Sequence, residues 1–134
     1  MKYILIMTTA LFVVVAHPVA ADQINSVHAE MVAKGKKVFN KCKACHSVKA
    51  DKHKIGPSLN GIFGREAGTA KGYRYSKTMK ASDITWNVVN LNLFLTKPRK
   101  FMKGTKMSFS GLKKEKDRTN IIAYMLSLQC QSRD

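Results

Sequence analysis

The sequence predicts an all-α domain whose helices are joined by long, glycine-rich loops. Two segments, one towards each end of the chain, repeat apolar residues at helical spacing. Between them, the stretch from His53 to Tyr75 contains five glycines and a proline, a density that argues against long regular elements. No segment shows the sustained alternation of apolar and polar residues that a sheet requires. We therefore expect helices at both ends and loops through the middle.

The first helix is predicted from the residues that precede Cys42. Apolar and small side chains recur at helical spacing from Val27 to Cys42, and lysines occupy the other faces. Asn25 and Ser26 are candidate caps for the start of this helix, because their side chains can accept hydrogen bonds from its first amides. We expect the helix to carry Cys42 near its end.

Cys42, Cys45 and His46 form the pattern Cys-x-x-Cys-His, the attachment signature of a c-type haem. On one helical turn the two sulfur atoms share a face, from which each can form a thioether to a haem vinyl group. His46, four residues after Cys42, can bring a ring nitrogen to the iron. The motif therefore predicts one covalently bound haem, over which the loop from His53 to Tyr75 folds.

Two other interpretations of the cysteine pair are a structural zinc site and a thioredoxin-type redox pair. Zinc would require a second pair of ligands at similar spacing, and the only other cysteine is Cys130. A thioredoxin motif would require a βαβ context, which the sequence does not show. Cys130 falls near the end of the last predicted helix and is expected to be a free thiol, and an intermolecular disulfide is the alternative.

After the glycine-rich loop, the sequence predicts two further helices from weak signals and a final helix from a strong apolar repeat. Residues 83–97 give a moderate helix signal that three asparagines weaken, and Pro98 suits the first turn of a further short helix. Residues 116–129 repeat apolar side chains at helical spacing and form the final helix. Gly35 would let another helix approach closely, so the first and last helices should cross there. The crossing is expected near Gly35, Phe39, Ile121 and Tyr124.

Residues 1–21 resemble a secretory signal peptide. Lys2 precedes an apolar stretch of 14 residues, Tyr3 to Ala16, and small residues lead to a cleavage position before Asp22. That stretch is shorter than the roughly 18 to 20 residues that span a bilayer. We expect export to the periplasm with cleavage, and an uncleaved N-terminal anchor is the alternative. Residues 22–134 then form one domain.

The predicted mature chain carries 23 basic and 8 acidic side chains, a formal charge of +15. Such a field favours acidic partners. The basic residues are scattered along the chain, and export would keep them away from nucleic acid, so no nucleic-acid partner is expected. The alternative is a solvated basic surface with no particular partner.

The sixth ligand of a haem iron distinguishes a carrier from an enzyme, because an open position binds gases or peroxide. Met31 and Met125 fall on apolar stripes and are interpreted as core residues. Met107 lies in the loop from Lys103 to Phe109, where an exposed thioether would be hard to explain. Met107 is therefore the candidate ligand, and Met102 is the second choice.

From about Lys34 to Leu128 the sequence resembles the soluble class I cytochromes c, close to the mitochondrial protein and to bacterial cytochrome c2. The matching segments occur in the family's order: residues 35–39 (Gly-Lys-Lys-Val-Phe), 42–46 (Cys-Lys-Ala-Cys-His), 53–59 (His-Lys-Ile-Gly-Pro-Ser-Leu), 61–65 (Gly-Ile-Phe-Gly-Arg), 84–86 (Ile-Thr-Trp), 103–107 (Lys-Gly-Thr-Lys-Met) and 121–124 (Ile-Ile-Ala-Tyr). The resemblance implies the class I cytochrome c fold, with helices and loops wrapped around one haem c.

The resemblance also implies roles for individual residues. His46 and Met107 would be the axial ligands of the iron, and the Pro57 carbonyl would accept a hydrogen bond from the His46 ring. The family contacts the haem propionates at the positions of Arg65, Tyr75, Ser76 and Trp86. The chain departs from the family pattern at Phe94 and Phe101, where tyrosine is common, and at Met79, where asparagine is common.

The function that the resemblance implies is one-electron transfer by a soluble monomer, without enzymatic activity. The expected donor is a cytochrome bc complex, and the expected acceptor is an oxidase or a photosynthetic reaction centre. The family places a ring of cations around the exposed haem edge: Lys41, Lys54, Arg99, Lys100, Lys106, Lys113 and Lys114. A haem enzyme or sensor with an open iron, and a purely structural haem protein, are the competing interpretations.

Overall fold

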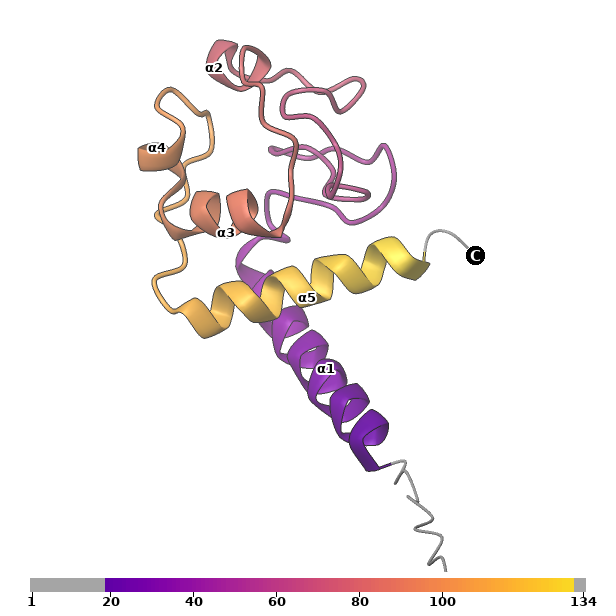
Figure 1. Ribbon diagram of the computed structural model, residues 1–134. Coiled ribbons are helices and arrows are strands. Elements are labelled where there is room, and N and C mark those ends of the chain that lie inside the picture. The colour runs from indigo at the N-terminus through magenta and orange to yellow at the C-terminus, as the bar shows by residue number, and fades with distance from the viewer. Residues whose placement is uncertain (1–18, 132–134) are drawn as a thin grey trace, which may run out of the picture.

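The computed structural model describes residues 19–131, and Figure 1 shows their arrangement. The helices are α1 (Val19–Val38), the 3-10 turn η1 (Phe39–Lys41), α2 (Lys77–Lys80), α3 (Val88–Thr96), α4 (Pro98–Phe101) and α5 (Glu115–Gln131). Within residues 19–131 the extended pairing is limited to one isolated bridge between Glu66 and Thr85. The all-α prediction is confirmed.

Helix α1 begins earlier than the sequence pattern predicted. It starts at Val19, so the prediction that Asn25 or Ser26 caps its first turn is wrong. Ser26 lies inside the helix, where its hydroxyl donates to the Gln23 carbonyl at 2.8 Å. No proline or glycine interrupts residues 19–34, and several alanines favour helix, which explains the longer element.

The end of α1 also differs from the prediction that the helix carries Cys42. Helix α1 ends at Val38, the chain tightens into η1, and Cys42 follows directly after it. Residues 42–46 form a turn in which the amides of Cys45 and His46 both donate to the Cys42 carbonyl, at 3.0 and 2.8 Å. This turn keeps the two cysteines and the histidine together beside the end of the helix.

Helices α1 and α5 cross where the sequence predicted the crossing (Figure 1). A side-chain carbon added to Gly35 would lie 2.0 Å from the Asn120 carbonyl oxygen and 2.7 Å from Cβ of Tyr124, so only glycine fits at this contact. The rings of Phe39 and Tyr124 pack with their centroids 5.5 Å apart. Ile121 is almost completely buried at the same crossing.

Helices α3 and α4 agree with the predicted elements within a few residues. Asn87 caps α3, and its side chain and that of Asn90 exchange hydrogen bonds with each other's backbone amides in a capping box. Pro98 begins α4, as predicted from its fixed φ. The four-residue helix α2, capped by Ser76, was not predicted, because so short a helix has no periodicity to detect.

The glycine-rich segment between η1 and α2 forms the predicted loop. Backbone hydrogen bonds join this loop to the residues before α3: the Gly64 amide donates to Trp86, the Trp86 amide to Arg65, and the Ala67 amide to Ile84. These bonds give the loop a fixed path without regular secondary structure. The core of the molecule lies between the loop, α3 and the crossing of α1 with α5.

Most of the predicted signal peptide lies outside the described residues, and Val19–Ala21 form the first turn of α1. Among residues 19–131, no helix has the length and apolar character needed to cross a membrane. The backbone of Cys130 lies in α5, and its expected state as a free thiol stays a prediction.

Candidate haem site

A cavity of about 420 Å³ lies between the glycine-rich loop, α3, the loop after α4 and the helix crossing. Its volume falls in the usual range for cofactor sites, and most of its wall is apolar. It is lined by all the side chains predicted for the site: Cys42, Cys45, His46, Pro57, Arg65, Tyr75, Ser76, Trp86 and Met107. Met102, the second candidate ligand, is buried in the core and is not among the lining residues.

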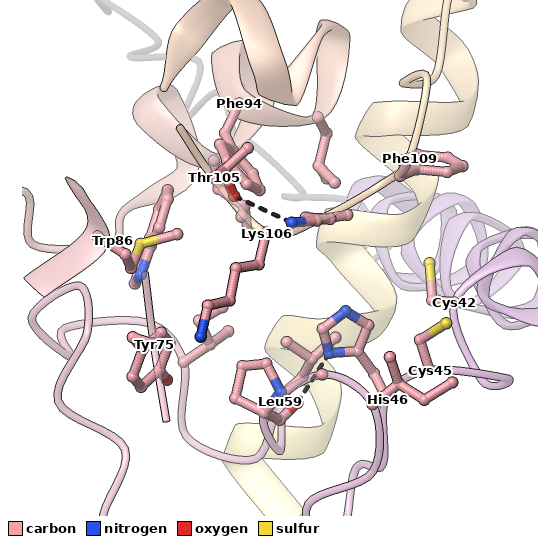
Figure 2. Close-up of a pocket in the computed structure, with 18 of the residues that line it drawn as sticks. Cys42, Cys45, His46, Leu59, Tyr75, Trp86, Phe94, Thr105, Lys106 and Phe109 are labelled. Atoms are coloured by element: carbon pink, nitrogen blue, oxygen red, sulfur yellow. Dashed lines mark hydrogen bonds between the residues drawn. The ribbon is translucent and has the colours of Figure 1, made fainter. Parts of the chain in front are cut away.

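The two cysteines line one side of the cavity as free thiols (Figure 2). Burial raises the pKa of Cys42 to about 11, and the neighbouring Cys45 adds to the rise. Cys42 is therefore a neutral thiol at neutral pH. Among residues 19–131, no group of three His, Cys, Asp or Glu side chains is placed to hold a metal ion.

The His46 ring has a fixed orientation. Its Nδ1 lies 2.8 Å from the Pro57 carbonyl oxygen and donates to it, so Nε2 is the nitrogen available to a metal (Figure 2). Burial lowers the pKa of His46, and the hydrogen bond to Pro57 only partly opposes this shift. The imidazole is therefore neutral at pH 7, the form that binds a metal.

Gly56 forms a cradle for the same ring, because a side-chain carbon at this position would lie 2.3 Å from Cε1 of His46. Gly56→Ala is expected to push the imidazole out of place and to lower the free energy of unfolding by about 2 kcal/mol. Urea unfolding of the purified protein measures this change. Gly61→Asn is the control, since Gly61 has open space around it and asparagine tolerates its φ of +58°. If Gly56→Ala and Gly61→Asn were equally stable, Gly56 would not lie as close to the His46 ring as described.

Hydrogen-bond donors lie at the end of the cavity opposite the two cysteines. In Figure 2, Trp86 and Tyr75 lie on the side away from the two cysteines. The Arg65 guanidinium donates to the carbonyls of Asn60 and Ser58, both at 3.0 Å, which holds it at the cavity wall. Burial raises the pKa of Tyr75, so its phenol stays a neutral donor. This donor set suits carboxylate groups at the edge of an apolar cofactor.

The loop that carries Met107 forms another wall. In Figure 2, Thr105 lies across the cavity from His46. The Met107 amide donates to the Thr105 hydroxyl at 3.3 Å, and Lys106 Nζ donates to the Arg74 carbonyl at 3.2 Å. Lys106 thereby ties this loop to the segment before α2.

Several lining residues were not singled out from the residue pattern. Ile55, Thr105 and Phe109 line the cavity, although an isolated apolar side chain or threonine in a loop gives no sequence signal of such a role. Phe94 and Met79, noted as departures from the family, also line it. The rings of Phe94 and Trp86 pack edge to face with centroids 5.1 Å apart, which makes this wall aromatic and apolar.

The residues present fit a haem. Two free thiols, a neutral imidazole with a free nitrogen, an apolar cavity and a cluster of carboxylate donors meet in one place. The glycine cradle behind His46 leaves room for the ring in the orientation that its hydrogen bond to Pro57 fixes. A fold and site of this kind define the class of c-type haem proteins.

Comparison with known proteins agrees with this assignment. The family model for cytochrome c matches residues 32–129. Cytochrome c-554 of Methylosinus trichosporium is 45% identical over 126 residues, which cover 93% of this chain and 92% of that protein. Cytochrome c2 of Rhodoblastus acidophilus is 48% identical over 92 residues, which cover 68% of this chain and 86% of the relative. Among solved structures, cytochrome cH from Methylobacterium extorquens superposes with a TM-score of 0.68 at 41% identity, covering 72% of this chain and 97% of that one.

The chain belongs to the cytochrome c family, as a class I soluble cytochrome c. Membership implies an electron carrier with a covalently bound haem c.

Proposed function

We propose that the protein is a one-electron shuttle between membrane redox complexes, with a haem held by Cys42 and Cys45 and axially ligated by His46 and Met107. The observation that carries the proposal is the meeting of the Cys42–Cys45–His46 turn and Met107 at one apolar cavity. When bound, the haem supplies a one-electron couple between Fe(III) and Fe(II).

The chain's own residues have separate tasks in this proposal. The Pro57 carbonyl fixes the tautomer and direction of His46, so that Nε2 would be the nitrogen that holds the iron. The Met107 thioether, a soft donor, favours Fe(II) and raises the reduction potential. Four polar side chains of the cavity wall would hold the propionates and compensate the burial of their charge: Arg65, Tyr75, Ser76 and Trp86. The apolar walls exclude water, which limits rearrangement on electron transfer.

Covalent attachment is tested with the cysteine variants of the exported protein. Cys42→Ala/Cys45→Ala should abolish haem that resists acid–acetone extraction, as measured by the pyridine haemochrome spectrum. Cys130→Ala is the control, because this cysteine lies outside the motif, and it should keep a full complement of haem. Extractable haem in the native protein would contradict the proposal.

Electrostatic steering should govern the encounter with acidic partners. Lys41 and Lys106 are exposed and line the cavity, and the other five cations predicted at the haem edge are also exposed. Raising the ionic strength from ~0.01 M to ~0.15 M shortens the Debye length from ~30 to ~8 Å, so the rate of transfer to an acidic membrane complex should fall about tenfold or more. Stopped-flow kinetics measure this rate.

A small uncharged reductant serves as the control for the salt experiment, since its rate should hardly change. A rate with the membrane complex that is equal at low and high salt would contradict steering. The proposed partners are a cytochrome bc complex as donor and an oxidase or a reaction centre as acceptor.

The proposal places the carrier in the periplasm after removal of residues 1–21, as a monomer. N-terminal sequencing of the mature protein tests this point. A sequence beginning at Asp22 is expected, and an intact N-terminus would favour the anchored alternative.

A further inference from the structure

The backbone beside the His46 ring is a short segment, Ile55, Gly56 and Pro57, which we call the His46 strap. The Pro57 carbonyl accepts the hydrogen bond from His46 Nδ1 at 2.8 Å. A side-chain carbon added to Gly56 would lie within 2.8 Å of three atoms of the ring, so the strap also packs directly against the ring. A displacement of the strap would therefore move the ring or break its hydrogen bond.

Hydrogen bonds hold the His46 strap on two sides. The Gly56 amide donates to the Cys45 carbonyl at 2.8 Å, which joins the strap to the turn that carries the cysteines. On the other side, the Tyr73 phenol donates to the Ile55 carbonyl at 2.7 Å. Tyr73 comes 18 positions later in the chain, in the last part of the glycine-rich loop. Its phenol thus connects two segments of this loop that are far apart in the sequence.

The first residue of the strap depends on this bond because its side chain is hardly packed. Ile55 is 79% exposed, so little apolar contact restrains it. Without the phenol, its carbonyl would bond to water and would be free to turn. The bond from Tyr73 removes that freedom, two residues before the carbonyl that orients His46.

The Tyr73 phenol is itself held in place. Its ring packs edge to face against those of His53 and Tyr75, with centroids 5.5 and 4.7 Å apart. Both ring nitrogens of His53 are bonded: Nδ1 accepts from the Ser58 amide at 3.0 Å, and Nε2 donates to the Lys71 carbonyl at 2.8 Å. His53 thereby joins the residue after the strap to the segment before Tyr73. The phenol is therefore a preorganised donor to the strap.

We propose that Tyr73 is a positioning residue for His46: by holding the strap, it keeps the Pro57 carbonyl on the imidazole Nδ1. The inference rests on the proposed function, because it takes His46 as an axial ligand. A hydrogen bond from Nδ1 raises the basicity of a metal-bound imidazole, and a more basic ligand favours Fe(III). Tyr73 thus lowers the reduction potential and counteracts the soft thioether of Met107.

The experiment compares Tyr73→Phe with the native holoprotein, because phenylalanine keeps the ring contacts and removes only the phenol oxygen. Solvent exchange of the His46 Nδ1 proton, followed by NMR of the reduced protein, should become about fivefold faster or more, because its acceptor is less firmly held. The reduction potential, measured by spectroelectrochemical titration, should shift to a higher value. A loss of stability alone would not move the potential.

Tyr124→Phe is the matched control, since it removes the same atom from a ring that packs against Phe39 at the helix crossing. In this variant, exchange of the His46 proton should stay within about twofold of the native rate, and the potential should be unchanged. The proposal would be overturned by native values in Tyr73→Phe, by equal changes in the two variants, or by a change in only one of the two quantities.

Failure of the proposed function would be seen separately, in the native protein. If His46 were not an axial ligand, its imidazole protons would lack the large upfield shifts that a haem ring imposes on a group directly above it. That result would contradict the ligation and, with it, the inference. Shifted imidazole signals together with unchanged exchange in Tyr73→Phe would contradict the inference alone.

Discussion

Replacing Met107 by leucine is expected to lower the reduction potential by something on the order of 0.2 V, within the roughly 0.8 V that axial ligands span. Leucine preserves the apolar contact but offers no lone pair, so under the proposed ligation the iron would lose the soft ligand that favours Fe(II). The open position should then bind carbon monoxide. Spectroelectrochemical titration of the variant against the native protein measures the change.

Two other methionines separate ligation from packing in that experiment. Met125→Leu changes a buried thioether that also lines the cavity, and Met102→Leu changes the second candidate ligand. Both variants should keep the native potential and remain closed to carbon monoxide. If Met102→Leu rather than Met107→Leu lowers the potential, the ligand has been assigned to the wrong residue.

Gly35→Ala is expected to have the largest effect on stability, a loss of about 3 kcal/mol or more in the free energy of unfolding. The added carbon would lie 2.0 Å from the Asn120 carbonyl oxygen, and this backbone atom of α5 cannot rotate away. Alanine favours an isolated helix over glycine by about 1 kcal/mol, so the expected sign is opposite to helix propensity. Denaturant unfolding followed by circular dichroism measures the difference.

Lys36→Ala is the control for the helix crossing, because Lys36 is exposed on the same helix beside Gly35. Its effect should stay within about 0.5 kcal/mol. A Gly35→Ala protein as stable as this control would mean that α1 and α5 do not approach as closely as described.

The fold could be predicted from the sequence where a single apolar stripe dominates an element. Helix α5 and the crossing at Gly35 follow from such stripes, and Pro98 marks the start of α4. The start of α1 was misplaced because a potential cap such as Ser26 does not end a helix whose preceding residues are also good helix formers. The path of the loop before α2 depends on distant bonds, such as that from the Gly64 amide to Trp86, which no local pattern encodes.

Some residues of the candidate site could be predicted from the sequence alone, some only from the family resemblance, and some not at all. Cys42, Cys45 and His46 follow from spacing alone, because the motif itself places three reactive groups together. Arg65, Tyr75 and Trp86 are distant in sequence, and only the family resemblance grouped them before the structure brought them to one cavity. The close approach of Gly56 to the His46 ring was not predicted, because a glycine in a glycine-rich loop gives no sign of what it contacts.

The most direct test of the central claim, a closed haem with His46 and Met107 as ligands, is the optical spectrum of the native protein before and after exposure to carbon monoxide. We expect a low-spin spectrum, a weak far-red band from an Fe(III)–thioether bond in the oxidised form, and no change when carbon monoxide is added to the reduced form. A high-spin spectrum, or ready binding of carbon monoxide, would show an open iron and would favour a haem enzyme or sensor over an electron shuttle.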